Sequence, residues 1–307
     1  MYPSPIEYAG RTGHPEDINM KRIAAFLLCL FLCFPASAGN IYTLPIDVSP
    51  GMPLIQSNYI DENTYIDPTV EMHISSGTYE GALYWVADVR IAHASQLRTM
   101  PASHFRSEMR KRTQVLSVRS NAVIAINGDF YAIEERLKGQ LLLRQGVLYA
   151  QQLIGVSDVL LIDEDGDFHF IPKAPADAVT TEINGKKIIN GFCFGPILVR
   201  DGVHVVSDSP DKYRSGEDQR ARTAICQLGP LHYAAVCCSD RTAQHNGMTL
   251  NTFGDLVMEL GAKQAYNLDG GNSTAMYTGS RMINKNRSLR NISDIIYFAS
   301  AWPGEEN

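Results

Sequence analysis

Asp269 ends a short apolar run and is followed by two glycines and three small polar residues, within the segment 268–274. Glycine lets the backbone adopt conformations closed to other residues and approach a ligand closely. Successive N–H groups in such a turn can form a concave anion site, here with a carboxylate at its mouth. The pattern indicates a functional turn at Asp269, Gly270 and Gly271, although Asp-Gly is also a common dipeptide of ordinary tight turns.

A second strand end of this kind lies upstream. Residues 122–126 carry no charge and are rich in β-branched side chains, which is typical of a strand buried on both faces. Asn127 and Asp129 follow directly, and active-site residues often lie where a rigid strand passes into a loop. An Asn-Gly hairpin turn is the alternative. Against it, apolar alternation does not resume in the charged residues 133–139.

Both strand ends are preceded by helical patterns. The apolar residues of 249–261 fall on one helical face, with Thr249 as the N-cap and Gly261 as the C-cap. A second pattern starts at Ser103 and ends near Thr113. We therefore expect the order helix, buried strand, polar loop to occur twice.

Five segments of the chain match, in order and spacing, the pattern of one enzyme family. The pattern has an Asn-Gly-Gly-Phe-Phe-like strand end, a Gly-Pro-x-Leu-Val-x-Asp-Gly segment, an Arg-Thr-Ala-Ile strand, a Leu-Asp-Gly-Gly-Gly-Ser-Ser/Thr run and a closing Arg-x-Val-Ser-Asn segment. The matching segments are residues 127–131, 195–202, 222–225, 268–274 and 290–294. In these segments the chain resembles the phosphodiester glycosidase family, from about Tyr84 to Phe298. It departs from the pattern at Asp129, Asn272 and Asp294.

The resemblance implies an exported glycosidase that hydrolyses the C1–O bond of a sugar-1-phosphodiester. An N-acetylhexosamine-1-phosphate linkage in an envelope or extracellular polysaccharide is the expected substrate. Asp269 and Asp129 are the expected catalytic residues, and Asp240 is an alternative candidate for either role. The residues expected to bind substrate are Asn127, Arg222, Gly270, Gly271, Ser273, Thr274, Arg290 and Asp294. Asp294 is also an alternative candidate for a catalytic carboxylate.

The residue types suit this chemistry. Glycosidases conventionally use two carboxyl groups beside the scissile bond, one as acid and the other as base or nucleophile. A phosphate leaving group needs less acid assistance, and arginine binds phosphate oxygens in a bidentate manner. A lone arginine is more often part of a surface ion pair, so the motif matches favour Arg222 and Arg290. Ser273 lacks a recognisable histidine partner that could activate it as a nucleophile, so we interpret it as a hydrogen-bond donor. Among the histidines, only His245 is kept as a possible site residue.

Two other functions remain open. A non-catalytic module that binds carbohydrate phosphate at the cell envelope would fit the substituted motif positions. A phosphodiesterase that breaks the P–O bond would usually need a metal cluster, and the sequence has no metal-ligand spacing to supply one. We therefore expect neither cofactor nor metal.

Composition and targeting limit the possible partners. Residues 20–38 show a basic start, an apolar stretch and the small-residue pattern Ala36-Ser37-Ala38, which predicts a secretory signal beginning at Met20. The apolar stretch is too short for a stable membrane span. We expect residues 1–38 to be removed and 39–307 to form the glycosidase-like domain, periplasmic or extracellular. A net charge of −6 without basic runs makes nucleic acid a poor partner.

Most of the remaining chain is predicted to be β-structure, with a strand at 82–91 and hairpins around 163–167 and 228–231. The acidic run 163–167 is a solvated turn rather than a calcium loop, because the glycine is misplaced for an EF-hand. The four cysteines that follow the signal can pair in three ways, and the sequence does not choose among them. We expect an α+β fold: a single compact domain with a mixed β-sheet and a few covering helices.

Overall fold

The computed structural model describes residues 41–130, 141–151, 157–175, 178, 180–206, 218–286 and 288–305. They belong to one compact unit, Ile41–Asn307. The expected signal peptide and the charged loop at 133–139 lie outside the described residues. No helix within the described ranges is long and apolar enough to cross a membrane.

The expectation of an α+β fold with a mixed sheet is wrong. The described residues are mostly β-structure, arranged in three sheets whose named strands all pair antiparallel, with only two α-helices. One expected helix is displaced: residues 103–112 are irregular, and α2 occupies Thr113–Arg119 instead. Arg106 has a positive φ of 71°, and Lys111 forms a β-bridge with Ile292. Both features are incompatible with a continuous helix there.

A nine-stranded sheet carries the second strand end. Along it the strands follow the order β1 (Tyr59–Asp61), β2 (Thr64–Asp67), β3 (Val70–Tyr79), β4 (Ala82–Ile91), β16 (His232–Cys238), β15 (Thr223–Gly229), β17 (Gln264–Leu268), β13 (Ile197–Arg200) and β14 (Val203–His204). The expected strand at 82–91 and the hairpin of β15 and β16 are confirmed. Asp269 follows the last residue of β17, in the interior of this sheet.

Two smaller sheets complete the fold. A five-stranded sheet has the order β19 (Arg281–Met282), β18 (Met276–Thr278), β6 (Ala122–Asn127), β20 (Asp294–Ala299) and β5 (Leu97–Pro101). The other contains β10 (Phe168–Ala174), β9 (Ser157–Asp163), β12 (Lys186–Phe192), β7 (Leu141–Arg144) and β8 (Val147–Gln151), with β11 (Glu182–Ile183) beside β12. Short 3-10 turns are η1 (Gln56–Asn58), η2 (Ala94–Gln96) and η6 (Gly271–Ser273).

One apolar cluster joins strands of all three sheets. Ile225 of β15, Ile124 of β6 and Leu160 of β9 belong to it, and each is at most 1 % exposed. Because side chains alternate along a strand, the neighbouring Cys226 points to the opposite face of the sheet, into a second cluster with α3. Burial on both faces explains why these strands lack polar alternation.

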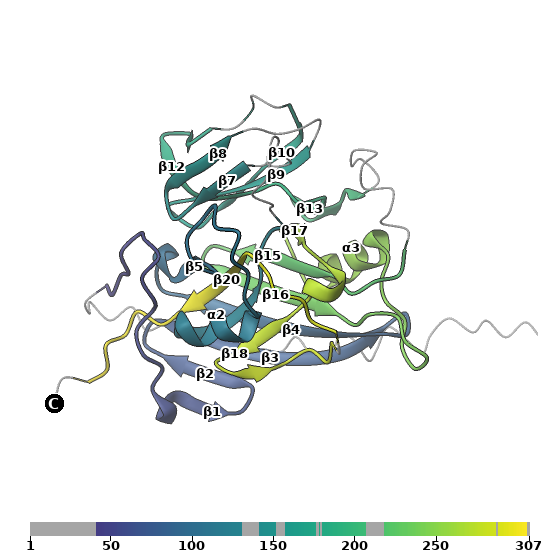
Figure 1. Cartoon of the computed structure of the whole chain (residues 1–307), viewed down its shortest axis with the longest axis horizontal. Helices are drawn as coiled ribbons and strands as arrows, with labels where there is room; N and C mark the ends of the chain where they lie inside the picture. Colours follow the sequence, from purple (N-terminus) through teal and green to yellow (C-terminus); the bar gives the residue numbers. More distant parts are fainter. Residues whose placement is uncertain are drawn as a thin grey trace, which may run out of the picture. The chain divides into compact units, whose positions relative to one another are not determined.

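The two helices cover outer faces of the sheets (Figure 1). α3 (Leu250–Glu259) packs beside β13 and matches the predicted helix, with the Thr249 hydroxyl accepting the Thr252 N–H as an N-cap. α2 packs beside β6 and β20 through the buried Leu116. Each strand end that carries a candidate carboxylate is therefore preceded by a helix, as expected.

The acidic turn between β9 and β10 is a hairpin turn, as predicted. Asp163 accepts the N–H groups of Asp165 and Asp167, and Lys186 Nζ lies 2.7 Å from an Asp165 carboxyl oxygen. The lysine and these backbone donors satisfy the acidic side chains within the protein. No group of His, Cys, Asp or Glu in the described part of the chain is placed to hold a metal ion.

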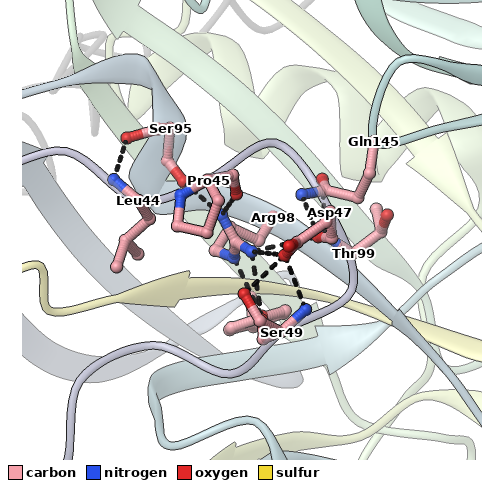
Figure 2. A network of polar contacts seen from close by, with 9 residues as sticks. Leu44, Pro45, Asp47, Ser49, Ser95, Arg98, Thr99 and Gln145 are labelled. Atoms are coloured by element: carbon pink, nitrogen blue, oxygen red, sulfur yellow. Dashed lines mark hydrogen bonds and ion pairs between the residues drawn. The ribbon is translucent and has the colours of Figure 1, made fainter.

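A buried arginine anchors the segment that leads into the fold (Figure 2). Arg98 of β5 is fully buried and donates to the carbonyls of Pro45, Asp47 and Ser49 at 2.8–3.0 Å. It also donates to the Tyr297 hydroxyl at 3.1 Å. Because a guanidinium has five N–H donors and no acceptor, a ring of oxygens suits it. This network accounts for Arg98 as a structural residue.

The cysteines contribute to packing. Cys226, Cys237 and Cys238 are buried free thiols in the nine-stranded sheet, and burial raises the pKa of each. Cys193 is buried beside Leu141, whose N–H donates to its sulfur at 3.3 Å. No disulfide joins cysteines among the described residues.

Candidate active site

The ends of β6 and β17 are joined by the side chain of Asn127. Its Nδ2 donates to the Asp269 carbonyl at 2.7 Å, and its Oδ1 accepts the Thr223 hydroxyl at 2.9 Å and the Ala275 N–H at 3.2 Å. Asn127 is fully buried. It therefore ties the five-stranded sheet to the nine-stranded sheet at the point where both candidate carboxylates emerge.

Asp269 is held on the open side of this junction. Its Oδ2 accepts the Ser273 hydroxyl at 2.6 Å and forms an ion pair with Arg290 Nη2 at 2.5 Å. Its Oδ1 accepts the Gly270 N–H at 2.9 Å. The Arg290 Nε also donates to the Ser273 hydroxyl, at 2.5 Å. Asp269 is 7 % exposed, so its carboxylate is fixed in direction but still reaches the cleft.

The backbone N–H groups of the glycine turn after Asp269 already donate hydrogen bonds within the protein. The Gly271 N–H donates to the Ala221 carbonyl, and the N–H groups of Ser273 and Thr274 donate within the turn. A side chain at Gly270 would place its Cβ 2.8 Å from the Ala221 oxygen, so this close approach requires glycine. Positive charge for an anionic ligand must therefore come mainly from side chains.

Asp129 has a different environment. It is 5 % exposed, and its carboxyl accepts its neighbour Phe130's N–H at 3.0 Å and the Cys193 N–H at 2.9 Å. Burial raises the pKa of Asp129 to about 7, although Arg144 and the Cys193 N–H act in the opposite direction. Asp129 therefore carries a proton for much of the time at neutral pH.

A buried ion pair lies behind Asp129. Arg144 Nε donates to Asp294 Oδ2 at 2.9 Å, and Arg144 Nη2 lies 3.8 Å from Asp129 Oδ2. Arg144 and Asp294 are both fully buried. A Cβ at Gly128 would stand 2.2 Å from Asp294 Oδ1, so this carboxylate packs directly on the backbone of the strand end.

An open cleft of about 350 Å³ adjoins Asp269. It is lined by Phe194, Arg220, Arg222, Asp240, Asp269, Gly270, Gly271, Asn272 and Arg290. A narrow crevice continues from it, shares Asp269 and Arg290 with it, and reaches Asp129 and Phe130. Both candidate carboxylates thus line the crevice. The volume of the adjoining cleft is in the range of small-molecule sites.

Arginines give the cleft its positive charge. Arg222 donates to the carbonyls of Met248 at 3.0 Å and Asp218 at 2.7 Å, which fix its guanidinium beside Gly270 and Gly271. Burial lowers the pKa of Arg222, which still leaves it protonated at neutral pH. An anionic group in the cleft would meet Arg222 and Arg290 together.

Comparison with protein families identifies this arrangement. The model of the phosphodiester glycosidase family matches residues 120–299, which include both strand ends, Arg144 and the cleft arginines. The chain belongs to the phosphodiester glycosidase family. Comparison with curated protein sequences found no significant match.

The fold is that of a solved member of this family. The catalytic domain of zebrafish N-acetylglucosamine-1-phosphodiester alpha-N-acetylglucosaminidase, auto-inhibited by its pro-peptide, is similar over 81 % of this chain and 87 % of that chain. The TM-score is 0.60 at 16 % identity. A hypothetical protein from Synechocystis is similar over 75 % of this chain and 62 % of its own, with a TM-score of 0.49 and 16 % identity.

Not all residues expected to bind substrate in this family member lie in the cleft. Asn127, Thr274 and Asp294 are fully buried, and Thr274 Oγ1 has no hydrogen-bond partner within the described residues. Arg222, Gly270, Gly271 and Arg290 line the cleft, and Ser273 lines the crevice. The alternative catalytic candidate Asp240 lies at the cleft, whereas His245 is not among the residues that line it.

Several residues at or behind the cleft are not singled out by the sequence, among them Arg144, Phe130 and Arg220. Arg144 ends the buried run Leu141–Leu143, so the logic applied to the other two strand ends could have found it. Phe130 is 38 % exposed, which is unusual for an aromatic side chain, and its ring centroid lies 5.5 Å from Arg290 Cζ. Two of the three departures from the family pattern, Asp129 and Asp294, meet at Arg144.

Proposed function

We propose that this protein hydrolyses the C1–O bond of a sugar-1-phosphodiester and releases the free sugar and a phosphomonoester. The observation that carries the proposal is the placement of Asp129 and Asp269 along one crevice, next to a cleft that is lined by Arg222 and Arg290. Paired carboxyl groups serve glycosyl transfer, and paired guanidinium groups serve a phosphate. Family membership supports the same reaction class.

The two carboxyl groups suit different roles. Asp129, with its pKa near 7, is the group that can donate a proton to the departing phosphate oxygen. Asp269, paired with Arg290, presents negative charge to the anomeric carbon as positive charge develops there. It receives the proton of the attacking water, whose oxygen bonds to C1. Proton transfer from Asp269 back to Asp129 through solvent then restores the site.

The phosphate is placed by Arg222 and Arg290. Both lie at the wall of the cleft, where the Met248 and Asp218 carbonyls hold the Arg222 guanidinium in place. A phosphodiester carries one negative charge, which makes it a better partner for this wall than a neutral glycoside. The open cleft leaves room for the alcohol of the diester to extend into solvent.

The proposal is tested by incubating the purified protein with a panel of sugar-1-phosphodiesters, including N-acetylhexosamine-1-phosphate esters, and measuring free reducing sugar. In ¹⁸O-labelled water the label should enter the anomeric oxygen of the sugar. Label in the phosphate would mean P–O cleavage and would overturn the proposal. Binding of the diesters without turnover would instead identify a carbohydrate-phosphate binding module.

The site of action is proposed to be the periplasm or the cell exterior. The basic, apolar and small-residue pattern that ends at Ala38 supports export, and an envelope or extracellular polysaccharide would then be the source of the phosphodiester. Mass spectrometry of the protein isolated from the producing cell should find Gly39 at its N-terminus. A soluble cytoplasmic form that retains residues 21–34 would contradict export.

A further inference from the structure

Arg144 stands between two buried carboxyl groups and is itself closed off from the cleft. Its Nε lies 2.9 Å from Asp294 Oδ2 and its Nη2 lies 3.8 Å from Asp129 Oδ2. Its Nη1 donates to the carbonyls of Leu143 and Gly191, and its Cζ lies 4.0 Å from the ring centroid of Phe192. These contacts fix the guanidinium plane.

Only Asp129 of these three charged residues reaches the crevice. Arg144 and Asp294 are absent from the residues that line the cleft and the crevice, within the part of the chain that the structure describes. Two ionised carboxylates with a single arginine would leave one uncompensated charge in a buried site, which is costly. The state in which Asp129 and Asp294 together hold one proton is therefore favoured. Burial raises the pKa of both Asp294 and Asp129, and Arg144 acts against burial at each of them. Asp294 makes the closer contact with Arg144, at 2.9 Å against 3.8 Å, so this geometry favours the proton on Asp129.

We propose that Arg144 and Asp294 are positioning residues for Asp129, fixing its carboxyl at the crevice and setting by their opposed charges when it holds a proton. Their role in turnover rests on the proposed function, whereas their effect on the protonation of Asp129 does not. Arg144 favours the ionised form of Asp129, and Asp294 favours the protonated form. Their opposition keeps the proton of Asp129 exchangeable near neutral pH.

Other groups also face Asp129 and must stay constant in a test. Asp269 lies along the same crevice and favours the protonated form of Asp129, as Asp294 does. The Cys193 N–H donates to Asp129 and favours the ionised form. Arg290 and Arg110 also line the crevice. None of these residues is changed in the variants below.

The test follows the Asp129 carboxyl directly, by ¹³C NMR titration of the full-length protein labelled at aspartate carboxyls. The Asp129 resonance is assigned by its loss in Asp129→Asn. We expect the titration midpoint to fall by about one pH unit or more in Asp294→Asn and to rise by a similar amount in Arg144→Gln. Arg144→Lys keeps the charge and should stay between wild type and Arg144→Gln.

A matched control comes from Asp163, which is also a buried carboxylate but pairs with His169 and Lys186. Asp163→Asn should leave the Asp129 midpoint unchanged. If Arg144→Gln does not fold, Asp294→Asn and the double variant Arg144→Gln/Asp294→Asn, which removes both charges together, still decide. Equal midpoints in wild type and folded Asp294→Asn, or shifts in the same direction in both single variants, would overturn the proposal.

Kinetics separate this inference from the proposed function. For sugar-1-phosphodiester hydrolysis, kcat/KM should fall at high pH as Asp129 loses its proton. The pH of this fall, the high-pH limb of the profile, should move in each variant in the same direction as the NMR midpoint. A purely structural pair would lower kcat/KM without moving the limb, and this result would refute the positioning role. If no diester is hydrolysed while the midpoints shift as expected, the proposed function fails and the electrostatic control of Asp129 stands.

Discussion

Arg290 and Asp269 form a 2.5 Å ion pair at the boundary between the cleft and the crevice that reaches Asp129. The pair is therefore positioned to bring the two halves of a substrate together. The arginine can bind the phosphate while the carboxylate faces the sugar carbon bonded to it. Ser273 bridges the two side chains and fixes their relative orientation.

Asp269→Asn should abolish most of the activity while the fold survives. The change removes the negative charge but keeps the shape, and Ser273 can still donate to the amide oxygen. Loss of a catalytic acid or base typically lowers kcat about 10²–10⁴-fold. Steady-state kinetics on a sugar-1-phosphodiester would measure this, with circular dichroism to check folding. Asp201 is exposed, so the control variant Asp201→Asn should keep the wild-type kcat. An equal loss of kcat in both variants would argue against a role for Asp269.

Phe130→Ala should raise KM with little effect on stability. The ring is 38 % exposed at the crevice, where it can pack on the apolar face of a sugar. Loss of such packing costs about 1–2 kcal/mol, or roughly 5–30-fold in KM. Phe130→Tyr keeps the ring and should retain near wild-type KM. Unchanged KM in Phe130→Ala would remove the ring from the binding surface.

The sequence predicts the two strand ends better than the fold around them. A continuous apolar run that ends in polar residues located β6, because burial on both faces removes the usual alternation, and the Asp-Gly-Gly turn after a short apolar stretch located the end of β17. The α+β expectation is wrong because the chain is mostly antiparallel β-structure, and the helix expected at residues 103–113 is wrong because tertiary contacts override its helical spacing. There, pairing of Lys111 with Ile292 determines the backbone instead. Local pattern carries no information about such distant partners.

The same limit applies to Arg144. Its partner Asp294 is 150 positions away, and nothing in the local sequence of either residue indicates their contact. Asp294 was expected to bind substrate because its motif lies at the closing segment of the site. The structure buries it one layer behind the crevice, where it contacts Arg144. The motif thus predicted that Asp294 lies near the site, but not that its side chain is buried against Arg144.

Asn127→Ala should destabilise the protein and lower activity together. The substitution leaves the Thr223 hydroxyl, the Ala275 N–H and the Asp269 carbonyl without their buried partner. Unsatisfied buried groups cost about 1–3 kcal/mol each, so for three such groups we expect a loss of roughly 3–9 kcal/mol in the free energy of unfolding, measured by urea denaturation. Thr223→Val removes only one of these bonds and should cost less. A stable Asn127→Ala protein would show that the cross-link is dispensable.

Asp129 should make the protein less stable as the pH rises. Its folded-state pKa of about 7 lies above its ordinary value of 3.8, so below about pH 4 it is protonated in both states and contributes nothing. Between about pH 4 and 7 it ionises only in the unfolded chain, so unfolding releases a proton and stability falls with rising pH. Above pH 7 the penalty is nearly complete, on the order of 4 kcal/mol for a rise of the pKa from 3.8 to about 7.

The measurement is the free energy of unfolding at pH 5 and at pH 8, compared between wild type and Asp129→Asn. Asparagine cannot ionise, so the loss of stability between the two pH values should be smaller in the variant by the part of the penalty that develops between pH 5 and pH 8, roughly 2–3 kcal/mol. Taking the difference between pH values cancels the constant effect of altered hydrogen bonds to the Cys193 N–H. If both proteins lose the same stability from pH 5 to pH 8, Asp129 does not hold a proton at neutral pH. The acid role proposed for it would then fail as well.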